Sequence, residues 1–90
     1  MIRWNILVLV CGYKTLEEKP PGTFEICNIC FWEDDAVQFD DPDYEGGANT
    51  PSLRQAQKNY VLYGACEERC IGFVRKPNEN DIKDPDWICL

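Results

Sequence analysis

The 90-residue sequence contains no histidine. This absence removes the commonest general base and the usual catalytic triads. It also means that a zinc or iron site must use thiolate, carboxylate or water ligands. Long apolar runs are missing as well, because Ile2–Val10 is interrupted by Arg3 and Asn5 and falls far short of the roughly 20 residues of a membrane helix. We therefore predict no membrane partner and a cytoplasmic location.

Basic residues are scarce, with 9 Lys and Arg against 16 Asp and Glu, and the formal charge is −7. Such a charge disfavours a nucleic-acid partner. The segment between Lys19 and Arg54 has no basic residue at all. Its acidic residues are Glu25, Glu33, Asp34, Asp35, Asp40, Asp41, Asp43 and Glu45. These acids predict either a solvated acidic face or, through the loop over residues 33–45, a docking surface for a basic protein partner such as a nuclease.

A chain of this length predicts a single domain over residues 1–90. Such a small domain buries only roughly 60–65% of its unfolded surface, so an additional source of stability is expected. Six cysteines are the obvious source, as metal ligands or as disulfides. In the cytosol metal ligands are the commoner use of clustered cysteines, although a disulfide framework remains an alternative.

Cys27-Asn28-Ile29-Cys30 is a Cys-x-x-Cys pair, which can place two thiolates on one tetrahedral metal ion. Fifteen residues separate Cys11 from Cys27, a spacing typical of paired zinc knuckles. The partner of Cys11 would stand at position 8, which holds Val8. Three thiolate ligands therefore fit the pattern and the fourth is missing.

The fourth ligand must come from elsewhere in the protein or from solvent. We place it at Cys66, which gives the predicted zinc ligand set Cys11, Cys27, Cys30 and Cys66. Cys70, Cys89, an acidic side chain, a water or a second subunit are the alternatives. Cys66 and Cys70 stand four residues apart, which would put both on one face of a helix, where packing is an equally good explanation.

The clearest predicted element is a helix over Pro51–Tyr63, with Thr50 as its N-cap and Gly64 as its stop signal. Its apolar residues recur at spacings of three and four, which indicates one buried stripe. Short strands are predicted from β-propensity and alternation. They cover Ile2–Val10, Thr23–Ile26, Val37–Phe39 and, near the C-terminus, Ile71–Val74. The predicted fold class is therefore α+β: a cysteine-pinned β-ribbon, one main helix and a short final strand.

Several motifs in this order and spacing resemble the cysteine-rich CPCC family of small, mostly bacterial proteins. The matching segments are Cys11–Leu16, Cys27–Asp35, Asp41–Asp43, Gly46–Asn49, Ser52–Gln57, Asn59-Tyr60 and Tyr63-Gly64. The resemblance implies a zinc-ribbon-like cysteine site followed by an acidic loop and a helix. The chain departs from the family at positions 8–11, where Val8-Leu9-Val10-Cys11 replaces Cys-Pro-Cys-Cys, and at Asn28 and Ile29.

We predict no enzymatic activity. With histidine absent, only carboxylates and thiols remain as acid, base or nucleophile. An acidic environment raises rather than lowers the pKa of a thiol, which disfavours a reactive cysteine. The predicted function is a small, non-catalytic, zinc-ribbon-like binding module, with an acidic inhibitor or immunity-type protein as the alternative.

Overall fold

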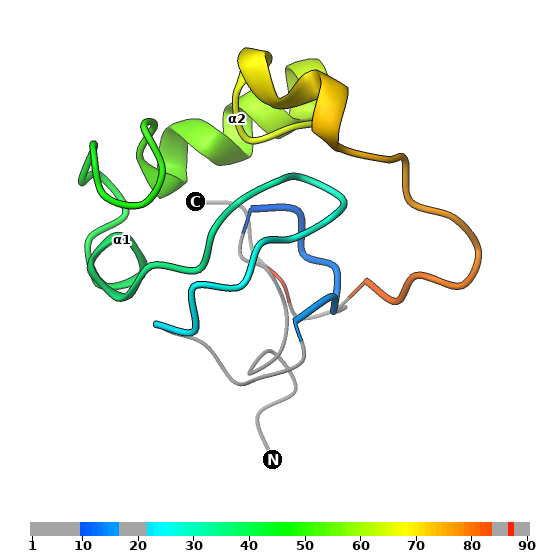
Figure 1. The fold of residues 1–90 in the computed structure, drawn as a ribbon, viewed down its shortest axis with the longest axis horizontal. Helices are drawn as coiled ribbons and strands as arrows, with labels where there is room; N and C mark the ends of the chain where they lie inside the picture. Colours follow the sequence, from blue (N-terminus) through cyan, green and yellow to red (C-terminus); the bar gives the residue numbers. More distant parts are fainter. Residues whose placement is uncertain (1–9, 17–21, 84–86, 88–90) are drawn as a thin grey trace.

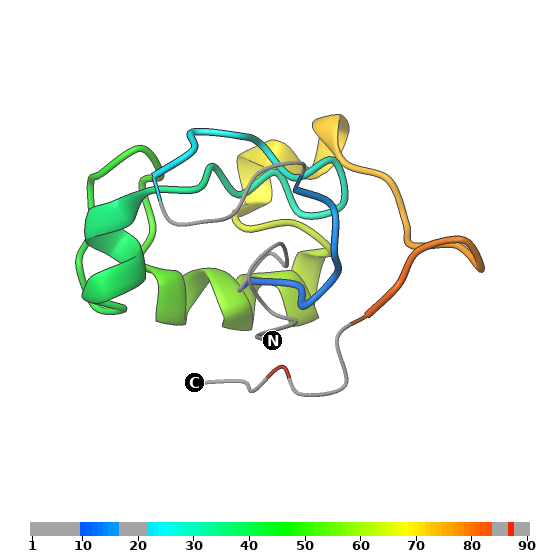
Figure 2. The same ribbon diagram turned by 90° about the horizontal axis from the view of Figure 1, so that it is seen from below.

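The computed structural model describes residues 10–16, 22–83 and 87 of the chain. Three short helices occur in these ranges: α1 (Ala36–Asp40), α2 (Leu53–Tyr63) and the 3₁₀ helix η2 (Glu68–Phe73). Helices α2 and η2 pack beside each other, and the loop over residues 74–83 projects from one edge of the molecule (Figure 1). Figure 2 shows α2 along one side of the molecule and the loop over residues 22–35 along the other.

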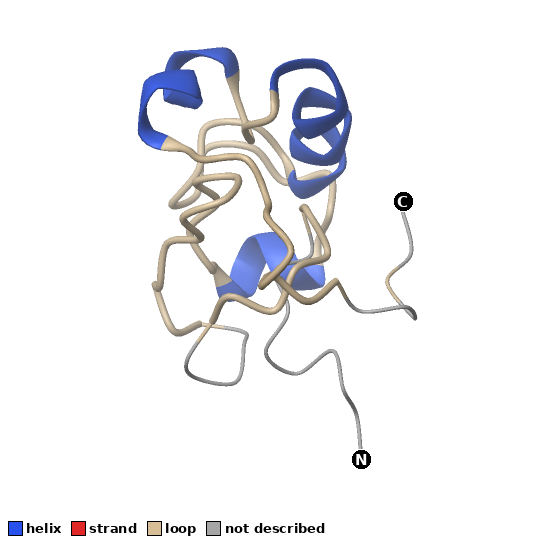
Figure 3. Cartoon of the chain, turned by 90° about the vertical axis from the view of Figure 1, so that its right-hand side faces the viewer, coloured by secondary structure: helices blue, strands red, loops and turns tan. Residues whose placement is uncertain are grey.

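The predicted α+β class is wrong, because the described residues contain no β-strand (Figure 3). The cysteine-pinned ribbon is reduced to two isolated bridges, Ile26 with Glu33 and Tyr13 with Lys83. Left-handed φ angles at Phe24 (60°) and Phe31 (67°) interrupt the extended backbone on both sides of the Ile26 bridge, which explains why no regular strand forms there. The predicted strand over Ile2–Val10 lies outside the described residues, apart from Val10.

Val37–Phe39, predicted as a strand, belongs to α1 instead. The side chain of Asp35 accepts hydrogen bonds from the backbone N–H groups of Val37 (2.8 Å) and Gln38 (3.0 Å). This N-cap satisfies two of the amides that a helix leaves unpaired at its start, and it turns the chain into a helix. Three alternating residues cannot outweigh such a cap.

Helix α2 confirms the predicted main helix and its stop, but its start differs. Ser52, rather than Thr50, is the N-cap, and its hydroxyl accepts a hydrogen bond from the N–H of Gln55 over 3.0 Å. Gly64 ends the helix in the left-handed conformation at φ 73°, and its N–H donates to the carbonyl of Tyr60. The N-terminal part of the predicted stripe, Leu53 and Ala56, is buried.

The predicted final strand over Ile71–Val74 is wrong, because Ile71–Phe73 lies in η2. No described strand lies alongside this segment, so the backbone uses local hydrogen bonds instead. The N–H of Cys70 donates to the carbonyl of Glu67 over 3.0 Å, closing one tight turn. The side chain of Phe73 packs on the ring of Phe31, with ring centroids 5.3 Å apart.

The core is small and rich in sulfur. Within the described ranges it contains twelve buried hydrophobic residues: Val10, Cys11, Leu16, Cys27, Ile29, Cys30, Trp32, Leu53, Ala56, Ala65, Cys66 and Cys70. Five of these are cysteines, so the stability of the core depends on the state of their thiols. Trp32 is buried among them and is the largest side chain of this core.

The backbone beside Cys11 approaches an aromatic ring closely. Gly12 has φ +79°, and a Cβ at this position would lie 2.8 Å from two ring atoms of Trp87. Only glycine fits both the backbone conformation and the space. The ring of Trp87 therefore packs against Gly12, the residue that follows the first cysteine of the knuckle pattern.

None of the described helices has the length and apolar character needed to cross a membrane.

Candidate metal centre

Three cysteines predicted as zinc ligands come together in the core. The sulfur atoms of Cys11, Cys27 and Cys30 all lie within 4.8 Å of one another. All three residues are at most 1% exposed. The Sγ atoms of Cys11 and Cys27 are 3.8 Å apart. Two sulfurs bound at about 2.3 Å to one tetrahedral zinc ion lie about 3.8 Å apart, so the spacing of this pair fits zinc ligation.

The loop around Cys27 is folded so that hydrogen-bond donors face its sulfur. Sγ of Cys27 accepts a hydrogen bond from the hydroxyl of Thr15 at 3.1 Å and one from the backbone N–H of Ile29 at 3.4 Å. The N–H of Phe31 donates to the carbonyl of Cys27 over 2.7 Å, which closes the turn between the two knuckle cysteines. Such donors stabilise the thiolate form of a metal ligand and fix its orientation.

The three thiols share their charge unequally. The hydrogen bond from Cys11, and next that from Cys30, lowers the pKa of Cys27 far below its ordinary value. The same contact with Cys27 is the main reason why the pKa of Cys11 is raised. Burial raises the pKa of Cys30. These shifts favour the thiolate form at Cys27 over Cys11 and Cys30, and the three thiols are buried together.

Cys66, the predicted fourth ligand, adjoins this group through its backbone but belongs to a different set of side chains. Its N–H donates to the carbonyl of Cys30 over 2.7 Å. Its sulfur lies within 4.8 Å of Sγ of Cys70 and of a carboxylate oxygen of Glu67. The side chain of Cys66 thus groups with Cys70 and Glu67, and its role as the fourth ligand of Cys11, Cys27 and Cys30 stays a prediction. Cys89, an alternative fourth ligand, lies outside the described residues.

The five described cysteines are all free thiols. Cys11, Cys27 and Cys30 form one sulfur group, and Cys66 and Cys70 form another with Glu67. Both groups could hold a metal ion, and neither contains a disulfide in this structure. The grouping of three and two cysteines is the central chemical feature of the molecule.

Several acids of the 33–45 loop have local structural roles. Asp34 is buried, and its carboxylate accepts hydrogen bonds from the N–H and the hydroxyl of Thr23 at 2.9 and 2.8 Å. Asp35 caps α1 and also accepts from the N–H of Ala48, which is the main cause of its lowered pKa. Asp43 forms an ion pair with Arg54 at 2.7 Å. Docking of this loop on a basic partner stays a prediction.

Two residues of the sulfur groups were missed by the sequence reasoning. Thr15 forms a hydrogen bond with Cys27, twelve positions further along the chain, and no local sequence pattern predicts this contact. Glu67 directly follows Cys66 in the sequence and precedes Cys70 by one helical turn, so its proximity to both was a signal that could have been used.

The geometry defines a small, loop-rich domain whose buried cysteine groups could bind a metal ion. A family model described as Cysteine-rich CPCC matches residues 8–81, which include both sulfur groups. The chain therefore belongs to the cysteine-rich CPCC family, which confirms the resemblance found in the sequence. A comparison with curated proteins found no match.

Proposed function

We propose that this protein is a small, non-catalytic zinc-binding module whose metal is held by Cys11, Cys27 and Cys30. The observation that carries the proposal is the convergence of three buried sulfurs, with the Cys11–Cys27 pair at 3.8 Å. The donor set of thiolates suits zinc among the common biological cations. When bound, zinc would supply folding free energy to a domain whose apolar core is small.

Three thiolates leave one position of a tetrahedral site to be filled. Cys66 is the residue that we predicted for it, although its sulfur groups with Cys70 and Glu67 rather than with the three sulfurs of the proposed site. In our proposal the fourth ligand is therefore a water molecule or a residue outside the described ranges, such as Cys89. With a water molecule in this position, the site would be less closed than a four-thiolate structural site.

A binding role is favoured over catalysis because the candidate thiolate is inaccessible to solvent. Cys27, the thiol with the lowered pKa, is 0% exposed. A nucleophilic cysteine must reach its substrate, and reactive cysteines are at least partly exposed. The sequence also offers no histidine to act as a base. The charge held on Cys27 is suited to binding a cation.

Zinc analysis of the purified full-length chain tests the proposal. We expect bound zinc in the wild-type protein, and the loss of one equivalent in Cys27→Ser. The exposed neighbour Asn28 lies in the same turn, so Asn28→Ser is the matched control and should keep the wild-type zinc content. A Cys27→Ser protein that is folded and binds as much zinc as the wild type would overturn the proposal.

A further inference from the structure

The second sulfur group lies where α2 is followed by η2, and it has the composition of a metal site of its own. Sγ of Cys66, Sγ of Cys70 and a carboxylate oxygen of Glu67 all lie within 4.8 Å of one another. The two cysteines are 1% and 4% exposed, and the side chain of Glu67 is 17% exposed. A carboxylate is thus held beside two buried thiols at the edge of the core.

The positions of these three residues are fixed by hydrogen bonds of their backbone, not by contacts between the candidate ligand atoms. The N–H of Cys66 donates to the carbonyl of Cys30, and its carbonyl accepts a hydrogen bond from the side-chain amide of Asn59 over 2.9 Å. The 3₁₀ turn of η2, closed by the bond from Cys70 to Glu67, places the second sulfur. The group is therefore preorganised, which reduces the entropy lost when a ligand binds.

Arg69 orients the carboxylate. Its Nε donates to Oε1 of Glu67 over 2.7 Å, while 71% of the Arg69 side chain remains exposed. Outer partners of this kind typically hold a ligating carboxylate in place. With both thiols ionised, the group carries a charge of −3, and Arg69 together with a divalent cation would balance it. The charges of these four side chains therefore match a metal ion of charge +2.

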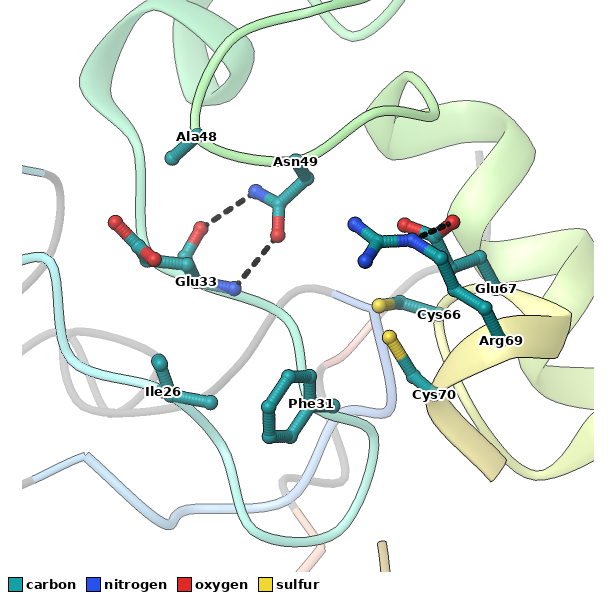
Figure 4. A pocket seen from close by; sticks show the side chains of 9 residues that line it. All are labelled: Ile26, Phe31, Glu33, Ala48, Asn49, Cys66, Glu67, Arg69 and Cys70. Atoms are coloured by element: carbon teal, nitrogen blue, oxygen red, sulfur yellow. Dashed lines mark hydrogen bonds and ion pairs between the residues drawn. The ribbon is translucent and has the colours of Figure 1, made fainter. Parts of the chain in front are cut away.

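The group also faces a cavity, shown in Figure 4. This cavity has a volume of about 50 Å³, and its walls include Cys66, Glu67, Cys70, Asn49 and Glu33. The sulfurs of Cys66 and Cys70 lie close to one another on one side of it. Space of this size holds at least one water molecule. A metal ion bound by the three side chains would thus have room for an exchangeable fourth ligand.

We propose that Cys66, Glu67 and Cys70 form a second, separate metal site for a thiophilic divalent cation such as zinc, with its fourth coordination position open to the cavity. Two thiolates and one carboxylate with an open position resemble the ligand pattern of exchangeable rather than closed zinc sites. This site goes beyond the proposed function and does not depend on it, because the two groups share no side chain.

Native mass spectrometry of the reduced full-length chain, titrated with Zn²⁺, tests the second site. We expect two equivalents in the wild-type protein and one in either Cys70→Ser or Cys27→Ser. A parallel titration with Co²⁺ should show thiolate-to-metal charge transfer in both variants. One equivalent that is lost in Cys27→Ser and kept in Cys70→Ser would leave the proposed function standing and overturn the second site. One equivalent that is lost in Cys70→Ser and kept in Cys27→Ser would support the second site and overturn the proposed function.

The carboxylate gives a variant that preserves the buried sulfurs, in case Cys70→Ser does not fold. Glu67→Gln should weaken binding of the second zinc ion by more than the roughly 10–100-fold that follows from losing only an outer partner of a ligand. Glu68→Gln, at an exposed neighbour, should not change it. Unchanged zinc binding by Glu67→Gln would show that the carboxylate of Glu67 is not a ligand, and would overturn the proposed ligand set. A single equivalent lost in both Cys27→Ser and Cys66→Ser would show that Cys66 completes the first site and would overturn the proposal. A mass lower by two hydrogen atoms, located on Cys66 and Cys70 under reducing conditions, would indicate a disulfide between them. This result would overturn the proposal as well.

Discussion

The hydroxyl of Thr15 donates a hydrogen bond to the sulfur of Cys27 over 3.1 Å, joining the segment of the first cysteine to the turn of the second pair. This bond favours the thiolate of Cys27 and is one of the causes that lower its pKa. A donor to a ligand sulfur tunes a metal site without touching the metal. Thr15 is therefore a positioning residue for the proposed zinc.

We predict that Thr15→Val lowers zinc affinity by about 10–100-fold, because the nearly isosteric side chain removes only the donor. The measurement is competition for zinc with a chromophoric chelator. Thr15→Ser keeps the hydroxyl and should bind as the wild type does. If Thr15→Val binds zinc with unchanged affinity while folded, as judged by circular dichroism, then the hydroxyl does not act on the metal site.

The start of α2 gives a second prediction. Ser52→Ala removes the hydroxyl that accepts the N–H of Gln55, and it should cost about 1 kcal/mol of unfolding free energy. Thr50→Ala should change the free energy by less than about 0.5 kcal/mol, since Thr50 is exposed and is not the cap. Urea unfolding of the two variants checks the difference. A larger loss of unfolding free energy in Thr50→Ala than in Ser52→Ala would show that Thr50 is the N-cap, as predicted from the sequence.

This helix shows what the sequence could and could not determine. Gly64 was predictable as the stop because a left-handed residue is needed there and glycine adopts it at little cost. Thr50 and Ser52 both have a hydroxyl and both lie beside Pro51, so propensity cannot choose between them. The choice is made by tertiary structure, because Ser52 is buried and Thr50 is not.

The candidate metal ligands were likewise predictable from the sequence only in part. Spacing alone predicted that Cys11, Cys27 and Cys30 would meet, because a knuckle is a local turn that aims its sulfurs inward. The assignment of Cys66 was not predictable from spacing. Its backbone is attached to Cys30, yet the direction of its side chain follows the turn that leads into η2. The family resemblance supplied the order of motifs, and the strand predicted over Thr23–Ile26 does not form because the backbone is left-handed at Phe24 and Phe31.

A third prediction concerns Gln38, which is 0% exposed and holds the loop between α1 and α2. Its Nε2 donates to the carbonyls of Tyr44, Asn49 and Pro51 at 2.9–3.1 Å. Its Oε1 accepts from the N–H and the side-chain amide of Asn49 at 3.2 and 2.9 Å. Removing the amide would leave several buried polar groups without partners, each at a cost of about 1–3 kcal/mol.

We expect Gln38→Leu to lower the free energy of unfolding by about 3–5 kcal/mol or to abolish a cooperative transition, because more than one buried group loses its partner. Thermal and urea unfolding measure this loss. The same substitution at the exposed Gln55 should change stability by about 0.5 kcal/mol or less. A stable Gln38→Leu protein would mean that water or a rearranged loop satisfies these groups.

The last prediction concerns acid stability and the loop over residues 74–83. Asp81 accepts two hydrogen bonds from the guanidinium of Arg75, at 2.7 and 2.8 Å, and one from the N–H of Asn78. Arg75 is the main cause that lowers the pKa of Asp81, to about 2. The N–H of Arg75 in turn donates to the carbonyl of Asn28, between the knuckle cysteines. Protonation of Asp81 would therefore loosen a loop that is attached to the knuckle.

The folded-state pKa of Asp81 lies below its ordinary value, so its contribution to stability is present above about pH 4 and is lost as the pH falls toward 2. Asp81→Asn should remove this contribution at neutral pH and flatten the acid limb of the stability profile between pH 4 and pH 2. Unfolding free energies measured across this range, for metal-free protein, make the comparison. Asp40→Asn, at an exposed acid, is the control and should keep the wild-type slope. Identical slopes in Asp81→Asn and the wild type would show that the ion pair makes no contribution to folding.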